Sequence, residues 1–160
     1  MRLVIAAVGR LKDGPERVLF ERYWERLEAN GRPLGLGPLQ LFEIRESRAS
    51  GQAARVADEA ERLLAKLSNT DFKIVLDEHG KSQSTAAFAA FLRSSRDAGT
   101  GSITFLIGGP DGHGPAALSA ASMSMSLGPM TLPHGLARIV LVEQLYRAAT
   151  ILAGHPYHRT

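Results

Sequence analysis

The sequence predicts an α/β fold in which a mostly parallel β-sheet is flanked by helices. Short apolar runs alternate with longer amphipathic segments along the chain, the order typical of β-α-β units. The apolar runs are nearly continuous, as in strands that are buried on both faces of a sheet. The chain has 160 residues and neither an internal repeat nor a low-complexity linker, so we expect one domain spanning residues 1–160.

The first half of the chain alternates two strands with two helices. The elements expected here are a strand over Arg2–Val8, a helix over Pro15–Gly31, a strand over Leu39–Glu46 and a helix over Ala53–Leu67. Pro15 suits the first turn of a helix, and Gly31 suits its end. The apolar stripes expected to face the core are Leu19, Tyr23 and Leu27 in the first helix and Ala57, Ala60, Leu64 and Leu67 in the second.

The second half continues the alternation. The elements expected here are a strand over Phe72–Leu76, a loop over 77–83, a helix from its N-cap Ser84 to Ala98, a strand over Ser102–Ile107, a short helix over Pro115–Ser122, a strand over Met123–Leu127 and a helix over Gly135–Ala153. The last helix is apolar on almost every side. It is either covered within the chain or part of a subunit interface. We favour the interface, because one small domain has little left to cover such a helix.

Composition narrows the class of protein. The chain contains no cysteine, which excludes disulfides, zinc–thiolate sites and cysteine nucleophiles and suits a reducing compartment. No apolar run reaches the length of a signal peptide or a membrane span, so we expect a cytoplasmic protein without membrane contact. The net charge of +3 and the pI of about 9.6 favour an anionic partner such as nucleic acid, but only weakly.

The strand ends are the expected binding site, because ligands of open parallel sheets bind outside the carboxyl ends of the strands. Four such ends are Gly9-Arg10, Leu76-Asp77, Ile107-Gly108-Gly109 and Leu127-Gly128, and three of them carry glycine. Glycine lets the backbone approach a ligand closely, which suits a flat or folded ligand held by main-chain amides and carbonyls.

The phosphate-binding and metal-binding motifs that this sequence suggests are all incomplete. The stretch FLIGGPDGHG, residues 105–114, does not fit the dinucleotide fingerprint GxGxxG in any register. Gly80-Lys81-Ser82 ends like a P-loop, but the position that requires the earlier glycine is Val75. His155 and His158 have the spacing of metal ligands, yet Pro156 separates them and no carboxylate lies nearby in the tail. We therefore predict no metal site and disfavour a nucleotide-phosphate enzyme.

The tail GHPYHRT, residues 154–160, is rich in functional side chains for a chain end. Histidine titrates near neutral pH, whereas arginine and tyrosine can hold an RNA phosphate and stack on a base. The alternative interpretation is an arbitrary polar chain end.

Several stretches together carry a family resemblance. They are VGRLKDG near the start, LDEHGKS (76–82), FLIGGPDG (105–112), SLGPMTLPH (126–134), LVEQLYRA (141–148) and the terminal HPYHR (155–159). In this order, and over the whole chain, they closely resemble the RlmH-type SPOUT methyltransferases. The resemblance implies a C-terminal trefoil knot, a homodimer, S-adenosylmethionine as methyl donor and the large-subunit (23S) ribosomal RNA of the assembled ribosome as substrate. The reaction that it implies is methylation at N3 of a pseudouridine.

The resemblance also implies site residues. The cofactor contacts carried over by matching motif are Leu76, Gly108, Leu127, Gly128, Pro129, Met130, Thr131 and Leu132. Methylation requires the weakly acidic N3–H to lose its proton, and His158 is the candidate base. Arg159 is expected to stabilise the developing anion or to clamp a phosphate, and Tyr157 to stack or position the base. Alternatively, the tail only binds RNA, or the whole protein is a non-catalytic RNA- or ribosome-binding factor.

Overall fold

Five strands form one parallel sheet in the computed structural model, which describes residues 1–158. The strands are β1 (Arg2–Val8), β2 (Leu39–Ile44), β3 (Phe72–Ser82), β4 (Ser102–Ile107) and β5 (Met123–Ser126). Their order across the sheet is β2-β1-β4-β3-β5, and every neighbouring pair is parallel. All carboxyl ends of the strands therefore lie along one edge, and the predicted α/β class is confirmed.

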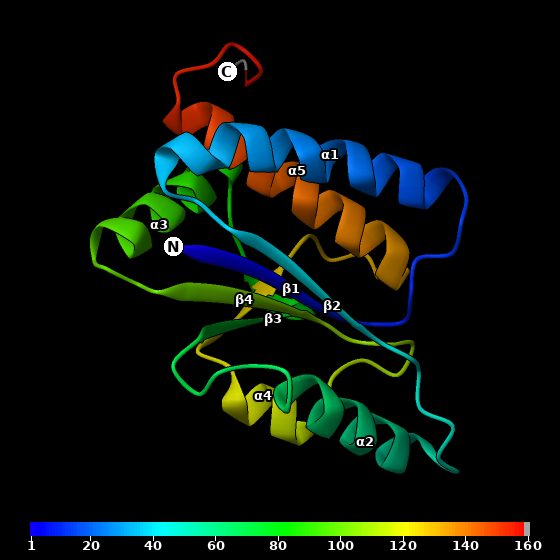
Figure 1. The fold of residues 1–160 in the computed structure, drawn as a ribbon. Helices are drawn as coiled ribbons and strands as arrows, with labels where there is room; N and C mark the ends of the chain where they lie inside the picture. Colours follow the sequence, from blue (N-terminus) through cyan, green and yellow to red (C-terminus); the bar gives the residue numbers. More distant parts are fainter. Residues whose placement is uncertain (159–160) are drawn as a thin grey trace.

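Helices cover both faces of this sheet. They are α1 (Pro15–Gly31), α2 (Gln52–Leu64), α3 (Thr85–Asp97), α4 (Pro115–Ala120) and α5 (His134–Leu152), with a short 3-10 turn, η1 (Arg32–Leu34), after α1. Figure 1 shows α1, α3 and α5 on one face and α2 with α4 on the other. The arrangement has three layers, as expected when helices connect parallel strands.

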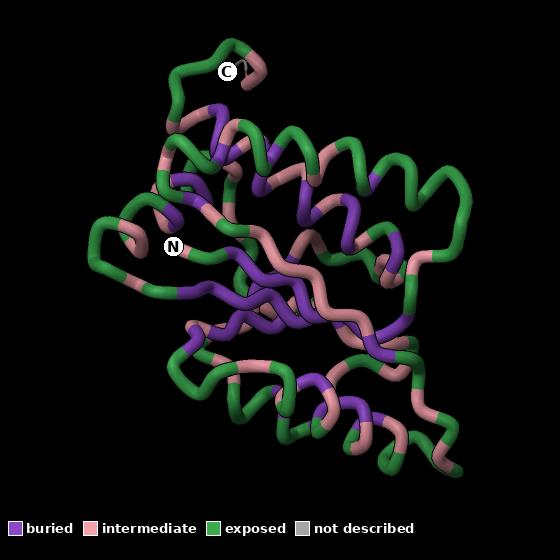
Figure 2. The backbone as a smooth tube through the Cα atoms, viewed as in Figure 1, coloured by how far each residue is buried: buried purple, intermediate pink, exposed green. Residues whose placement is uncertain are grey.

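The core lies on both sides of the central strands, as the buried stretches of Figure 2 show. Every residue of β4 and all but the first of β1 are buried. Alternate residues of β1 face opposite layers: Leu3 and Ile5 pack with Phe20 of α1, whereas Ala6 packs with Leu63 of α2. Burial on both faces is what the continuous apolar runs predicted.

Strand β3 is longer than the sequence predicted. The expected loop over 77–83 is wrong, because β3 continues to Ser82 and pairs with β5 a second time through Lys81 and Ser82. The register shifts between Leu76 and Lys81, which is the signature of a bulge. A Cβ on Gly80 would lie 2.7 Å from the backbone of Met125, so only glycine fits where these two strands cross most closely.

The buried stripes of α1 and α2 differ from the predicted ones. In α1, Leu27 is buried as expected but Leu19 is exposed, and Phe20 takes its place. In α2 the buried residues are Val56, Glu59, Ala60 and Leu63, one position away from most of the predicted set. Glu59 explains the shift, because its carboxylate is turned inward and accepts a hydrogen bond from the Ser47 amide at 2.7 Å. A hydrophobic pattern has no means of placing a buried carboxylate.

Helix α5 is covered largely within the chain. It packs against α1 and α3 and buries ten residues, among them Leu141, Val142 and Leu145. Its apolar composition therefore needs no second copy to explain it, and Leu136 is its one exposed residue within the described part of the chain. The trefoil knot implied by the resemblance stays a prediction.

Candidate active site

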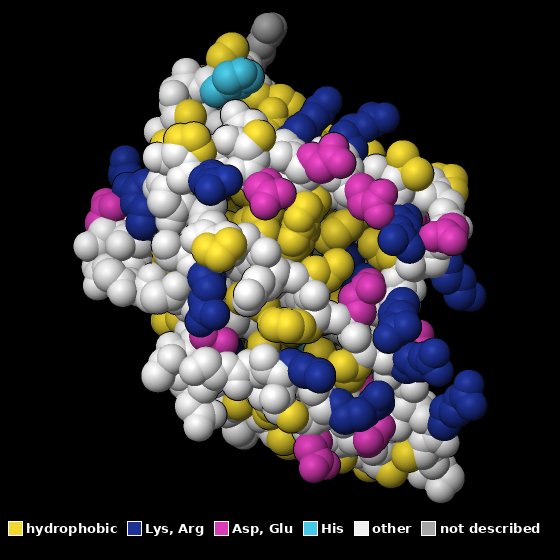
Figure 3. Space-filling model, viewed as in Figure 1, with side chains coloured by type: hydrophobic (Ala, Val, Ile, Leu, Met, Phe, Trp, Pro, Cys, Tyr) yellow, Lys and Arg dark blue, Asp and Glu magenta, His cyan; other side chains and the backbone are white. Residues whose placement is uncertain are grey.

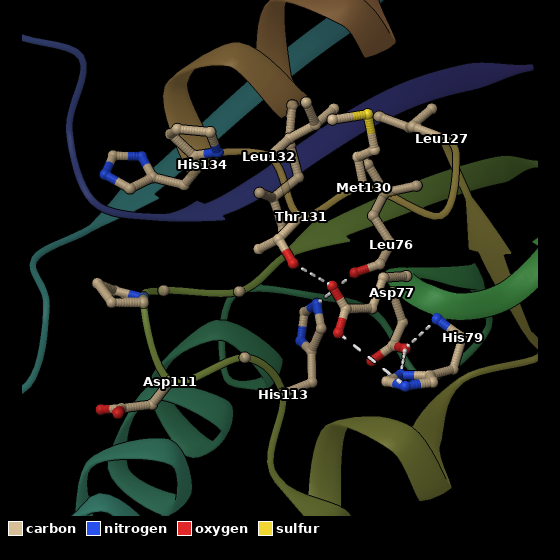
Figure 4. A pocket seen from close by; sticks show the side chains of 18 of the residues that line it. Leu76, Asp77, His79, Asp111, His113, Leu127, Met130, Thr131, Leu132 and His134 are labelled. Carbon is tan, nitrogen blue, oxygen red and sulfur yellow. Dashed lines mark hydrogen bonds and ion pairs between the residues drawn. The ribbon is translucent and has the colours of Figure 1, made fainter.

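A cavity of about 760 Å³ opens at the carboxyl ends of β4 and β5 and beside the bulge in the middle of β3. Its size suits a small-molecule ligand. Three segments enclose it: the turn inside β3 around Asp77, the loop 108–114 after β4, and the loop 127–133 after β5. The first turn of α5 closes one side through His134 and Ala137. Figure 4 shows these segments converging from separate elements.

The loop after β4 folds back on itself at the floor of this cavity. The Gly112 amide donates to the Gly109 carbonyl at 3.0 Å, which closes a tight turn. A Cβ on Gly108 would lie 2.7 Å from the carbonyl oxygen of Gly112. The turn therefore requires glycine at position 108 for its own closure, before any ligand is considered. Because the turn lacks side chains at these positions, main-chain groups are what it offers to a ligand.

His113 ties this loop to the neighbouring strand. Its Nε2 lies 3.1 Å from the carbonyl oxygen of Leu76, so this nitrogen carries the proton and donates. Burial lowers the pKa of His113, although the carboxylate of Asp77 and the carbonyls of Leu76 and Leu106 act in the opposite direction. In Figure 4 the imidazole of His113 lies below Leu76. At neutral pH the ring is an uncharged clamp that holds the Leu76 peptide at the cavity.

Carboxylates dominate the charge of the cavity lining. Asp77 and Glu78 both line it, and Thr131 donates a hydrogen bond to Glu78 across the cavity mouth. Asp111 is neutralised by Arg55 of α2 at 2.6 Å, and this hydrogen bond holds the pKa of Asp111 below its usual range. The β3 side of the cavity therefore keeps negative charge, which attracts a cationic ligand and repels a polyphosphate.

The start of α5 is locked to the ends of β1 and β2. Arg138 is fully buried, pairs with Glu43 of β2 and donates to the Gly9 carbonyl at 3.0 Å. Burial lowers the pKa of Arg138, and the partnership with Glu43 opposes that shift. One turn earlier, His134 turns toward Glu46, with 3.7 Å between its Nε2 and the carboxylate. Its Nδ1 is buried and has no hydrogen-bond partner among residues 1–158.

The structure brings together nearly all of the residues for which the resemblance implied cofactor contact. Those lining the cavity are Leu76, Gly108, Leu127, Gly128, Met130, Thr131 and Leu132. Pro129, an exposed residue of the same loop, does not line it. Of the four predicted strand ends, Gly9-Arg10 also stays outside the lining. Whether the lining residues bind the cofactor stays a prediction.

The tail residues lie apart from this cavity. Tyr157 packs at a tilt against Tyr146 of α5 with 4.7 Å between ring centroids, and its hydroxyl donates to Glu143 at 3.2 Å. Arg147 lies over the same ring at 4.7 Å. Neither Tyr157 nor His158 lines the cavity of its own chain, and Arg159 lies outside the described residues. The sequence analysis assigned the tail and the cofactor residues to one site, but within one chain Tyr157 and His158 lie away from the cavity.

Tyr157 is suited to donating a hydrogen bond and not to accepting a proton. Burial raises the pKa of its hydroxyl, and the neighbouring Tyr23 and Glu143 raise it further. The phenol stays protonated at neutral pH, which excludes it as a general base in this conformation.

Sequence reasoning missed several lining residues. Asp77, Glu78, His113 and His134 all line the cavity. The sequence placed Asp77 at a predicted strand end but gave the other three no role at the site. Their positions in the fold explain why they meet: Asp77 and Glu78 lie within β3, His113 follows β4, and His134 begins α5. The two carboxylates lie in the segment 77–83, where a loop prediction gives no reason to turn them toward a ligand.

Residues 1–158 contain neither a cluster of metal-ligating side chains nor a helix that could span a membrane. No group of three or more His, Cys, Asp or Glu side chains in this part of the chain has the geometry of a metal site. None of its helices is both long and apolar enough to cross a membrane.

The fold and the cavity define a parallel α/β protein with a cavity of small-molecule size at the carboxyl edge of its sheet. A family model described as "Predicted SPOUT methyltransferase" matches residues 1–158. The chain therefore belongs to the SPOUT methyltransferase family.

Individual relatives are similar over their full length. The chain is 50% identical over 160 residues to "Ribosomal RNA large subunit methyltransferase H" of Brucella anthropi, with 100% of both chains covered. It is 48% identical over 159 residues to the protein of the same name from Bradyrhizobium diazoefficiens, with 99% of each covered. Among solved structures, the crystal structure of a hypothetical protein aligns with a TM-score of 0.52 at 15% identity, over 94% of this chain and 80% of the other. That likeness concerns the fold alone.

Proposed function

We propose that this protein transfers the methyl group of S-adenosylmethionine to N3 of a pseudouridine in 23S ribosomal RNA, acting as a homodimer on the assembled ribosome in the cytoplasm. The observation that carries the proposal is the cavity at the carboxyl edge, lined by the segments whose motifs match the family. The full-length relatives named as ribosomal RNA large subunit methyltransferases support the same reaction class.

The cavity fits a cationic cofactor of this size. Its volume of about 760 Å³ lies in the range of small-molecule sites. Asp77 and Glu78 supply negative charge, and the turn around Gly108 offers main-chain groups without side chains in the way. When bound, S-adenosylmethionine supplies an electrophilic methyl group on a sulfonium. Loop 127–133 and the Leu76 peptide, which His113 holds, are the segments that would grip it.

The nucleobase must lose its N3 proton and be aligned with the donor. The three histidines of the lining, His79, His113 and His134, each contact a group of their own chain. We therefore assign the histidine of the tail, His158, as the base. Arg159 would hold a base carbonyl or a phosphate, and Tyr157 would position the base as a hydrogen-bond donor. The alternative, in which the tail only binds RNA, leaves positioning to supply most of the rate.

The position of the tail supports the proposed dimer. Helix α5 runs for 19 residues, so roughly 27 Å separate its two ends at 1.5 Å per residue. The cavity lies at its start and the tail folds on its second half, beside Glu143 and Tyr146. A tail from a second copy would therefore complete each site. The exposed apolar side chains Val18 and Leu19 on α1 and Leu136 on α5 offer a contact surface for that copy.

Two measurements test the proposal. Calorimetry on the purified protein should detect S-adenosylmethionine binding, and a protein that binds ribosomes but no cofactor would be the non-catalytic factor instead. Mass spectrometry of 23S ribosomal RNA from a deletion strain should then show a pseudouridine that lacks one methyl group. Adding the protein and cofactor to ribosomes of that strain should restore it, and no gain in mass would overturn the assigned reaction.

A further inference from the structure

Four cationic side chains lie together where β1 and β2 end. Arg10 and Lys12 follow β1, and Arg45 and Arg48 follow β2. All four are exposed. The two segments lie side by side, because Val8 pairs with Ile44 and the Gly9 amide donates to the Ile44 carbonyl at 2.9 Å. We call this set of four residues the basic rim.

The basic rim is not neutralised by carboxylates of its own chain. Elsewhere arginines are mostly paired: Arg17 with Glu21, Arg55 with Asp111 and Arg62 with Asp58. Within residues 1–158, no rim side chain takes part in an ion pair. Figure 3 shows Lys and Arg side chains gathered toward this end of the sheet. Unpaired cations at one edge are available to an anionic partner.

The rim adjoins the mouth of the cavity through two contacts. Glu46, which lies between Arg45 and Arg48, faces His134 of the cavity lining at 3.7 Å. Glu59 contacts both sides: one of its oxygens accepts from the Ser47 amide at 2.7 Å, and the other lies 3.1 Å from where a Cβ on Gly109 would be. The loop that carries Arg45 and Arg48 is thus held directly beside the loop that forms the cavity floor.

Charge changes sign across this boundary. The rim carries the cations, whereas the far side of the cavity carries Asp77 and Glu78. A phosphate is attracted to the first region and repelled from the second, and a cationic cofactor shows the reverse preference. We therefore expect the RNA phosphate on the rim side of the cavity mouth and the cationic cofactor on the side of Asp77 and Glu78.

We propose that the basic rim holds the phosphate backbone of the RNA substrate, so that one nucleotide reaches the cavity from the β1–β2 side. This inference rests on the proposed function. RNA fits the rim better than an acidic protein surface does, because none of the exposed large apolar side chains found within residues 1–158 lies among the rim residues to anchor a protein interface. Exposed Arg and Lys without apolar neighbours are typical of phosphate contacts.

The test compares two double variants with the same change in charge. Arg45→Glu/Arg48→Glu reverses half of the rim. Lys66→Glu/Arg93→Glu reverses two other exposed cations, one after α2 and one on α3, that have no ion-pair partner in the described chain either. Binding to ribosomes from the deletion strain is measured over a range of salt concentrations, together with S-adenosylmethionine affinity and thermal unfolding.

The rim variant should bind ribosomes about tenfold to a hundredfold more weakly, with a shallower salt dependence. Removing one phosphate contact lowers the slope of log K against log salt by about 0.7 to 0.9. The control variant should bind like the unmodified protein. Equally weakened binding in both variants, or an unchanged slope in the rim variant, would overturn the proposal.

Two further readouts separate the alternatives. Protein-free 23S ribosomal RNA is tested beside whole ribosomes, and a defect seen only with whole ribosomes would assign the rim to a ribosomal protein and overturn the RNA contact. Arg45→Gln/Arg48→Gln should lose less affinity than the reversal, which guards against misfolding as the cause. Cofactor affinity should stay unchanged in the rim variant; if even the unmodified protein binds no cofactor, the proposed function fails while the salt slopes still decide the rim.

Discussion

The two ends of α5 each carry an arginine paired with a glutamate, but in opposite settings. At the cavity end, Arg138 is fully buried with Glu43 and also donates to the main chain of β1. At the tail end, Arg147 pairs with Glu143 four residues earlier and is partly exposed, with Tyr157 against it. The first arrangement locks three elements together. The second is a local contact on one helix, on which the tail rests.

The contrast suggests that the cavity end of α5 is held fixed and that the tail end is released more easily. A cavity formed by main-chain turns needs fixed strand ends, and the buried pair supplies them. The Tyr157 ring, its contact with Arg147 and one hydroxyl hydrogen bond to Glu143 hold the tail, and such a hydrogen bond to a carboxylate contributes about 1.5 to 3 kcal/mol. Release of the tail from α5, which the proposed dimer requires, therefore costs less than a rearrangement at the cavity end.

The largest expected effect tests the chemistry assigned to the tail. His158→Ala should lower kcat by about a hundredfold to ten-thousandfold, the usual contribution of a general base. The affinity for S-adenosylmethionine should stay unchanged, because His158 does not line the cavity of its own chain. Single-turnover methylation at saturating ribosomes is the measurement. Full turnover in the variant would remove the base role and leave the tail with RNA binding.

A smaller but still large effect separates the two ion pairs. Arg138→Met leaves Glu43 without its buried partner and should lower the free energy of unfolding by about 3 to 5 kcal/mol. Arg147→Met is the matched control and should cost at most about 1 kcal/mol, as partly exposed pairs do. Urea unfolding followed by circular dichroism measures both. Similar losses of stability in the two variants would refute the contrast between the two ends of α5.

How much of this the sequence could predict differs between the strands and the site. Periodicity and glycine placement were enough for β1, β4 and α1, whose bounds match the prediction. They failed at β3, because the second half of that strand is polar and forms only through pairing with β5. The length of β3 thus depends on its tertiary contact with β5, which a local sequence pattern does not indicate.

The candidate site could likewise be predicted only in part. The position of the cavity followed from the rule that ligands bind at carboxyl strand ends, and it holds for Leu76, Gly108 and Leu127. The carboxylate side of the cavity and the inward Glu59 depend on partners far away in the chain. The remoteness of Tyr157 from the cavity was equally hidden, since sequence order says nothing about where a chain end folds.

A moderate effect tests the turn beneath the cofactor site. Gly108→Ala places a methyl group 2.7 Å from the Gly112 carbonyl, so the turn must open. Overpacking of this kind costs about 1 to 3 kcal/mol, and we expect cofactor affinity to fall by about tenfold or more. Gly101→Ala is the control, because nothing lies within 4 Å of its added methyl group. Calorimetry compares the two, and equal affinities would show that the turn is not part of the cofactor site.

The smallest effect tests the histidine clamp and carries a defined pH dependence. Burial holds the pKa of His113 in the folded protein below its unfolded value of about 6.5. The unfolded chain therefore binds the proton more readily, and stability increases with pH through this region. The contribution is complete above about pH 6.5 and is lost as the pH falls toward the folded pKa.

Two variants isolate this contribution. His113→Gln keeps an N–H donor for the Leu76 carbonyl but does not titrate, so its unfolding free energy should decline less than that of the unmodified protein between about pH 7 and about pH 5. His113→Leu removes the donor as well and should lose a further 0.5 to 1.5 kcal/mol or so at neutral pH. It should also weaken S-adenosylmethionine binding more than His113→Gln does, because the Leu76 peptide is no longer held at the cavity. Parallel pH profiles for all three proteins would show that His113 does not titrate with folding, and equal cofactor affinities would show that its hydrogen bond does not shape the site.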